Sequence, residues 1–149
     1  MKFTHSWLMD HLETDATSEE IANTLTKIGL EIENVTNPGD FIKEFIVVSV
    51  DKVIKHPNAD RLKICLVNNG EENYEVVCGA PNAREGIKGV LAREGQFIPG
   101  LDLKLKKSEI RGVVSNGMLL SEKELGISDE HEGIVELSGN FALGSSAAN

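Results

Sequence analysis

The amino-acid sequence predicts a mainly β protein, in which a five-stranded antiparallel barrel follows a small α/β segment. Hydrophobic residues repeat with a helical period only before residue 40, and beyond it they form runs of strand length. Clusters of Gly, Pro, Asn and Asp separate these runs, as turns separate the strands of small barrels. A β-sandwich would have the same periodicity and stays open as the alternative architecture.

The helical patterns lie near the amino end. Ser6–Leu12 has apolar residues at the spacing of one or two helical turns. A stronger helix is expected to begin after Thr17, which stands three residues before Glu20 in the capping-box pattern, and to end at Gly29. Leu30–Glu33 then alternates between apolar and acidic residues, which predicts a short strand.

The turn cluster Asn37–Asp40 divides the chain into a segment of residues 1–40 and a barrel domain of residues 41–149. The first segment has too few large apolar side chains to bury a core alone, so we expect it to be part of a domain completed elsewhere in a longer chain. A capped helical piece is expected near Ser121–Leu125. The predicted strands are Phe45–Ile54, Leu62–Asn68, Tyr74–Cys78, Lys88–Ala92, Leu103–Ile110 and Ile134–Leu137.

Length and composition indicate a soluble cytoplasmic protein. The chain has 149 residues, of which 40% are hydrophobic, enough for one ordinary domain with a core. No apolar run approaches the roughly 18 residues of a membrane span, and Asp10 interrupts the amino end before a secretory core can form. Cys65 and Cys78 lie in apolar runs and are expected to be buried, reduced thiols.

The charge distribution permits a polyanionic partner although the net charge is −9. Residues 1–40 contain two Lys or Arg against eight acids, residues 41–118 contain twelve against ten, and residues 119–149 contain one against six. Nearly all cations therefore lie in the middle of the chain. Attraction to phosphate depends on the local face, because screening limits it to roughly 10 Å at ordinary salt.

Three polar stretches are candidates for binding RNA. They contain the cations Lys55, Arg61 and Lys63 in the turn 55–63, Asn82 and Arg84 in the loop 79–86, and Arg111, Ser115 and Met118 in the stretch 110–120. Arginine pairs with phosphate through two N–H groups or stacks on a base, and amides can pair with base edges. The competing interpretations are a solvated turn, an Asn82 that caps its own loop, and a Met118 that fills the core.

Aromatic residues are few, with one Trp, one Tyr and five Phe. Proteins that bind single strands without sequence preference stack bases on aromatic side chains. We therefore expect recognition of the shape and backbone of a folded RNA, with at most one or two splayed bases.

Catalytic and metal-binding patterns are not found. The sequence around Ser115 is not a nucleophile elbow, because its first glycine stands one place too early. The four histidines form no metal-ligand spacing with the two cysteines, and no phosphate-binding loop with a lysine is present. We expect no catalytic residue, metal site or cofactor in the chain itself.

Three ordered motifs resemble a known family: Lys55–Leu62, Val77–Asn82, and Ile110–Val113 followed by Ser115, Gly117 and Met118. Together they resemble the tRNA-binding domain with the oligonucleotide/oligosaccharide-binding (OB) fold. That domain occurs in some methionyl-tRNA synthetases, in free-standing tRNA-binding proteins, and near the start of the bacterial phenylalanyl-tRNA synthetase β subunit. Residues before the barrel, from Trp7 to Glu33, resemble the start of that β subunit, of which the chain would be an amino-terminal fragment.

The resemblance implies a role in protein biosynthesis. It also implies that the parent enzyme is a class II aminoacyl-tRNA synthetase, a ligase that attaches phenylalanine to tRNA with ATP and Mg²⁺ as an α2β2 heterotetramer, and that its aminoacylation site belongs to the α subunit. The positions that match the family's tRNA-facing loops are Asn82, Arg84, Ser115 and Met118; charge adds Lys55, Arg61, Lys63 and Arg111. A structural module that docks a partner and has little RNA affinity is the alternative function.

Overall fold

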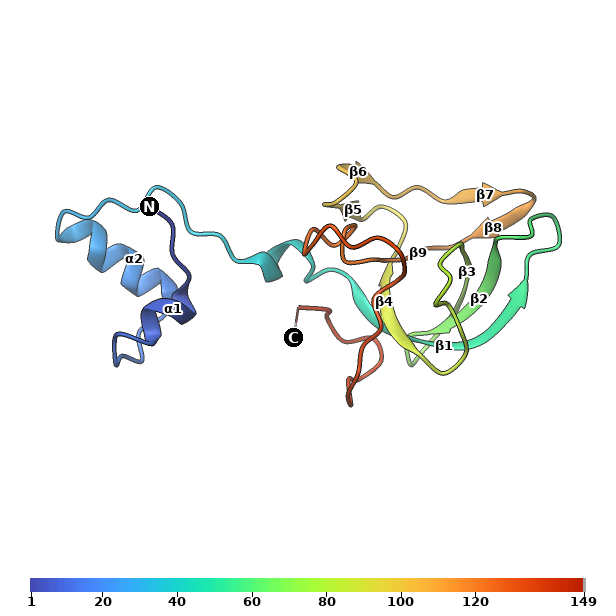
Figure 1. Ribbon diagram of the computed structural model, residues 1–149, viewed down its shortest axis with the longest axis horizontal. Helices are drawn as coiled ribbons and strands as arrows, with labels where there is room; N and C mark the ends of the chain where they lie inside the picture. Colours follow the sequence, from blue (N-terminus) through green and yellow to red (C-terminus); the bar gives the residue numbers. More distant parts are fainter. Residues whose placement is uncertain (149) are drawn as a thin grey trace. The chain divides into compact units, whose positions relative to one another are not determined.

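The computed structural model describes residues 1–148 and contains two compact units, Met1–Asn37 and Pro38–Asn149. Figure 1 shows the helices in the first unit and the strands in the second. None of the helices in residues 1–148 is long and apolar enough to cross a membrane.

The first unit contains helices α1 (His5–Met9) and α2 (Ser18–Lys27). The capping box predicted for α2 is confirmed: the Thr17 hydroxyl accepts from Glu20 N, and the Glu20 carboxylate accepts from Thr17 N at 2.8 Å. These bonds satisfy amide groups that have no partner within the helix, and the hydrogen bonds that Thr17 donates to the Glu20 carboxylate lower the pKa of Glu20. Gly29 follows the helix with φ +98°, so the predicted glycine stop is confirmed as well.

The strand predicted at Leu30–Glu33 is wrong, because these residues have no regular secondary structure. A strand needs a partner for its backbone groups, and the described first unit contains no other strand. Neither helix of this unit has a fully buried residue. Its exposed large hydrophobic side chains are Met1, Phe3, Trp7, Leu12, Ile28, Leu30 and Val35.

The second unit begins with a short 3-10 helix, Pro38–Phe41, and folds into the predicted barrel. Its main sheet is antiparallel, in the order β3-β2-β1-β4-β9. The strands are β1 (Ile46–Lys55), β2 (Lys63–Asn68), β3 (Asn73–Cys78), β4 (Lys88–Ala92) and β9 (Met118–Leu119).

The sheet curls until its two ends meet. Asn116 N donates to Glu75 O at 2.9 Å, and Val77 N donates to the Ser115 hydroxyl at 3.0 Å. These bonds join the residues before β9 to β3, so the barrel is nearly closed. The five-stranded OB-type barrel expected from the sequence is therefore confirmed, and the sandwich alternative is excluded.

Two hairpins extend the barrel: β5 (Phe97–Ile98) with β6 (Leu103–Lys104), and β7 (Ser108–Ile110) with β8 (Val113–Ser115). The single strand predicted at Leu103–Ile110 is therefore wrong. Leu105 exchanges backbone bonds with Gly95 and Gln96, whereas β7 pairs forward with β8, so the two halves belong to different hairpins.

The helix predicted at Ser121–Leu125 and the strand predicted at Ile134–Leu137 do not form as regular elements, although backbone hydrogen bonds hold both segments. Ile134–Leu137 is not a regular strand, yet Val135 N donates to Leu120 O and Leu137 N donates to Lys88 O. Ser121–Leu125 is a turn whose cap bonds between Ser121 and Glu124 are present. Hydrogen bonds to distant residues hold Ile134–Leu137, and local cap bonds hold Ser121–Leu125, without the regular strand or helix that the local patterns predict.

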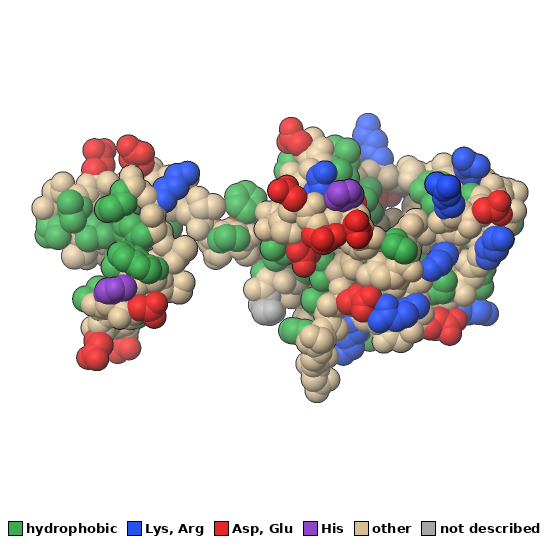
Figure 2. All heavy atoms as spheres, in the orientation of Figure 1, with side chains coloured by type: hydrophobic (Ala, Val, Ile, Leu, Met, Phe, Trp, Pro, Cys, Tyr) green, Lys and Arg blue, Asp and Glu red, His purple; other side chains and the backbone are tan. Residues whose placement is uncertain are grey.

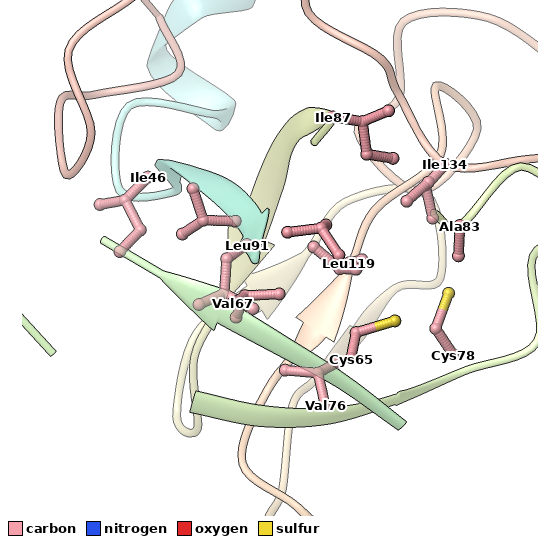
Figure 3. Packing of buried hydrophobic residues seen from close by; sticks show 12 residues of the cluster. Ile46, Cys65, Val67, Val76, Cys78, Ala83, Ile87, Leu91, Leu119 and Ile134 are labelled. Carbon is pink, nitrogen blue, oxygen red and sulfur yellow. The ribbon is translucent and has the colours of Figure 1, made fainter. Parts of the chain in front are cut away.

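The barrel core consists of side chains from the inner face of the sheet and from the closing segments (Figure 3). Its members include Val48, Val50, Cys65, Val67, Val76, Cys78, Leu91, Leu119 and Ile134. The two cysteines are free and buried, as expected, and Figure 3 shows their sulfur atoms close together. A hydrogen bond between the thiols lowers the pKa of Cys78 and raises that of Cys65.

Candidate nucleic-acid interface

Two loops far apart in the sequence are fastened to each other by His56 and Asn58. The His56 ring is only 2% exposed, and its Nε2 lies 2.9 Å from Ile110 O. Its Nδ1 accepts a hydrogen bond from Asn58 N at 3.0 Å, which requires the neutral ring to carry its proton on Nε2, the nitrogen that donates to Ile110. The Asn58 amide donates to Arg111 O at 3.0 Å. The turn after β1 and the β7–β8 hairpin therefore form one edge.

We call residues 55–61 and 106–112 the hairpin rim. Arg61 and Arg111 are exposed, and neither side chain has an ion pair or hydrogen bond among residues 1–148. Lys55 lies 3.5 Å from Asp60, but both side chains are mostly exposed, so this pair contributes little to stability. Three of the predicted cations are thus together on one rim and available to solvent.

Lys63 has a structural role beneath this rim. It pairs with Lys55 across β1 and β2 and with Cys78 across β2 and β3. Its half-buried ammonium group donates to Ala83 O at 2.9 Å and to Pro81 O at 3.5 Å. The cation therefore anchors the loop after β3.

Asn82 fastens that same loop to the segment that follows the β9 region. Its amide donates to Ile134 O at 2.8 Å, and its carbonyl accepts from Ile134 N at 3.0 Å. A Cβ at Gly133 would lie 2.5 Å from Asn82 Oδ1, so only glycine allows this approach. We call residues 79–84 and 133–136 the loop clasp.

Arg84 belongs to the loop clasp as well. Its guanidinium donates to the two oxygens of Glu136 at 2.6 and 2.8 Å and to Asn82 O at 3.2 Å. The hydrogen bonds with Arg84 lower the pKa of Glu136 and raise that of Arg84. The pair is exposed to solvent, but an RNA phosphate would have to compete with a bidentate carboxylate for this guanidinium.

Ser115 and Met118 lie on the closing strands of the barrel. Ser115 is buried, and its hydroxyl accepts from Val77 N and donates to Gly117 O at 2.9 Å. Met118 is half-buried against the core and also lines an open cavity of about 270 Å³, together with Pro81, His131 and other residues of both loops. Of these two side chains, only Met118 has a surface that a ligand could contact.

The structure thus divides the eight predicted residues into three groups. Lys55, Arg61 and Arg111 share the hairpin rim. Asn82, Arg84 and Met118 lie around the loop clasp and its cavity, and Lys63 and Ser115 are engaged in bonds within the barrel. The contact of all eight with tRNA stays a prediction.

Sequence reasoning missed several residues of the rim. Lys106 and Lys107 directly precede β7 and are exposed. They fall inside the single strand predicted at Leu103–Ile110, and that prediction does not place them at the base of a hairpin. His56 and Asn58 lie in a polar turn beside a proline, and nothing in that local pattern indicates that the histidine is buried.

The surface charge of the barrel is divided in the same way (Figure 2). Lys and Arg side chains gather over β7 and β8 and the neighbouring ends of β1 and β2, whereas acids gather over the segment that follows β9. That acidic segment contains Glu122, Glu124, Asp129, Glu130, Glu132 and Glu136. Within residues 1–148, no three His, Cys, Asp or Glu side chains are grouped to hold a metal ion. The arrangement offers hydrogen-bond donors and charge to a polyanion.

Comparison with known proteins agrees with this geometry. Residues 45–146 match the protein family described as "Putative tRNA binding domain". The phenylalanine–tRNA ligase beta subunit of Ruegeria pomeroyi is 53% identical over 92% of this chain and 17% of its own length. The corresponding subunit of Zymomonas mobilis is 52% identical over 98% of this chain and 19% of its own length. The chain therefore spans less than a fifth of these relatives.

A solved structure shows the same fold. The crystal structure of a MetRS related protein from Pyrococcus horikoshii matches with a TM-score of 0.51 and 19% identity, over 76% of this chain and 98% of the other. The family match covers more than half of the 149 residues and nearly the whole barrel. The chain belongs to the tRNA-binding-domain family.

Proposed function

We propose that this chain is a tRNA-binding module of a phenylalanine–tRNA ligase beta subunit. The observation that supports this best is the family match over the barrel, together with a rim of solvent-exposed cations on that barrel. Sequence identity above 50% with beta subunits supports the assignment to this ligase over other proteins that carry the domain. The module binds tRNA through phosphate contacts and contributes auxiliary contacts to a reaction that takes place elsewhere in the enzyme.

The parent enzyme, in this proposal, is a cytoplasmic class II ligase that aminoacylates tRNA with phenylalanine. It uses ATP and Mg²⁺, and its α subunit assembles with β as an α2β2 heterotetramer. Neither ATP nor Mg²⁺ binds to the fragment. The chain supplies affinity for tRNA and no catalytic group.

Residues 1–40 are, in the same proposal, part of a domain that the rest of the beta subunit completes. Neither helix there buries a residue, and the side chains of Phe3, Trp7 and Leu30 are largely exposed. Apolar surface of this kind in so short a segment favours packing against further protein.

Titration of fluorescently labelled tRNA with the 149-residue chain at several salt concentrations tests the function. We expect binding that weakens linearly in a plot of log affinity against log salt, because each phosphate contact releases counterions. Absence of binding at low salt, or an affinity independent of salt, would contradict the proposal.

A structural docking module remains the second candidate function. The acidic segment after β9 and the internal bonds of Lys63, Asn82 and Ser115 favour it, because they reduce the surface available to RNA. Assembly of the ligase with and without this module separates the two functions. Lost assembly at unchanged tRNA affinity supports docking, and lost tRNA affinity in an assembled enzyme supports RNA binding.

A further inference from the structure

The hairpin rim has more cations than the three that sequence analysis placed there. Lys106 and Lys107 add two exposed ammonium groups at the base of the β7–β8 hairpin. With Lys55, Arg61 and Arg111 the rim has five cations, against the two acids Asp60 and Glu109. Among residues 1–148, the side chains of Arg61, Lys106, Lys107 and Arg111 have no ion pair or hydrogen bond. No side chain of the described residues therefore competes with a phosphate for these four cations.

The backbone that carries Arg61 and Arg111 is fixed. His56 and Asn58 fasten the turn after β1 to the hairpin through the carbonyls of Ile110 and Arg111. The ring of His56 is buried, so this connection is protected from water. A surface that is already ordered loses less conformational entropy when it binds.

Arg111 occupies a backbone position that favours other residues. It has φ +49° and Gly112 has φ +88°, between the paired residues Ile110 and Val113. A two-residue hairpin turn with two positive φ angles favours Asn, Asp or Gly, because the Cβ of any other residue crowds the backbone there without a compensating local hydrogen bond. An arginine at this position has a conformational cost and offers no internal contact for its guanidinium. Such strain motivates the hypothesis that the side chain serves binding.

We propose that the phosphate backbone of a folded RNA docks on the hairpin rim, with Arg61, Lys106, Lys107 and Arg111 as its phosphate contacts. The inference rests on the proposed function and specifies where on the barrel it acts. The loop clasp lies outside this contact. The guanidinium of Arg84 is already paired with the carboxylate of Glu136, and the neighbouring acids repel phosphate. Double-helical RNA is recognised largely through its backbone and shape, which suits a rim without aromatic platforms.

Two double variants with the same change in charge test the inference. Arg61→Ala/Arg111→Ala removes two rim cations. Lys43→Ala/Lys123→Ala removes two exposed cations that do not belong to the rim: Lys43 precedes β1, and Lys123 lies in the acidic segment. Labelled tRNA is titrated with each 149-residue variant over a range of salt concentrations, and circular dichroism checks that each variant is folded.

We expect the rim variant to lose on the order of tenfold in affinity at low salt and to reduce the slope of log affinity against log salt by about two. The control variant should keep the slope of the unmodified chain. Equal losses in both variants, or a loss confined to an Arg84→Ala variant, would overturn the rim assignment while leaving tRNA binding intact. If the unmodified chain does not bind tRNA, the proposed function itself fails.

Discussion

The hairpin rim and the loop clasp contain similar residues that the fold uses in different ways. Each joins two distant segments through an asparagine side chain, and each contains an arginine beside that asparagine in space. In the rim, His56 and Asn58 make the connection, and the guanidinium of Arg111 is left to solvent. In the clasp, Arg84 is itself part of the connection, because Glu136 accepts both of its N–H groups. The same residue type is thus available for binding in one loop and structural in the other.

The largest expected effect on the hairpin rim comes from a substitution at His56. His56→Ala should lower the free energy of unfolding by about 3 kcal/mol, because Ile110 O and Asn58 N would lose their partner in a buried place. Urea denaturation measures this loss, with exposed His131→Ala as the control. A loss below about 1 kcal/mol would show that the hairpin does not depend on this ring.

A substitution in the loop clasp should lower the stability of the chain and leave its tRNA affinity unchanged. Asn82→Ala should lower the free energy of unfolding by about 1.5 kcal/mol, because two backbone bonds to Ile134 are lost. Its tRNA affinity, measured at a temperature where the variant is folded, should equal that of the unmodified chain. Weaker tRNA binding at unchanged stability would instead show that Asn82 belongs to the RNA-binding surface.

Features that depend on neighbouring residues could be predicted from the sequence, whereas contacts between distant residues could not. The capping box of Thr17 and Glu20 and the strands β1 to β4 depend on neighbours in the chain or on periodic burial, which a pattern reveals. The bond between Arg84 and Glu136 joins residues 52 positions apart, and that between His56 and Ile110 joins residues 54 apart. No local pattern indicates which acid meets an arginine or which turn histidine is buried. The predicted strand at Leu30–Glu33 failed for a similar reason, because its pairing depended on a partner that residues 1–37 do not provide.

Arg111→Asn should separate stability from binding at the rim. Asparagine tolerates positive φ, so the variant should gain about 0.5 kcal/mol in the free energy of unfolding. Its affinity for tRNA should nevertheless fall severalfold, because one phosphate contact is removed. Thermal melting and tRNA titration are made on the same samples. A variant that gains stability and keeps its affinity would show that Arg111 does not contact RNA.

The smallest expected effect concerns the ion pair of the clasp. Arg84 lowers the pKa of Glu136 in the folded chain, so the pair stabilises the fold above the ordinary pKa of a glutamate and loses this contribution as pH falls through the lowered value. The melting temperature of Glu136→Gln should therefore lie slightly below that of the unmodified chain at pH 7 and approach it in acid. Because the pair is exposed, the difference should be small and reduced by salt. A difference that grows in acid would contradict this assignment.

The position of the RNA on the barrel is tested most directly by backbone amide chemical shifts of the 149-residue chain during titration with tRNA. We predict that the shifted resonances belong to residues 55–61 and 106–112, and that residues 79–84 and 133–136 keep their positions. Shifts gathered on the loop clasp and around Met118, with an unchanged hairpin rim, would contradict the central claim.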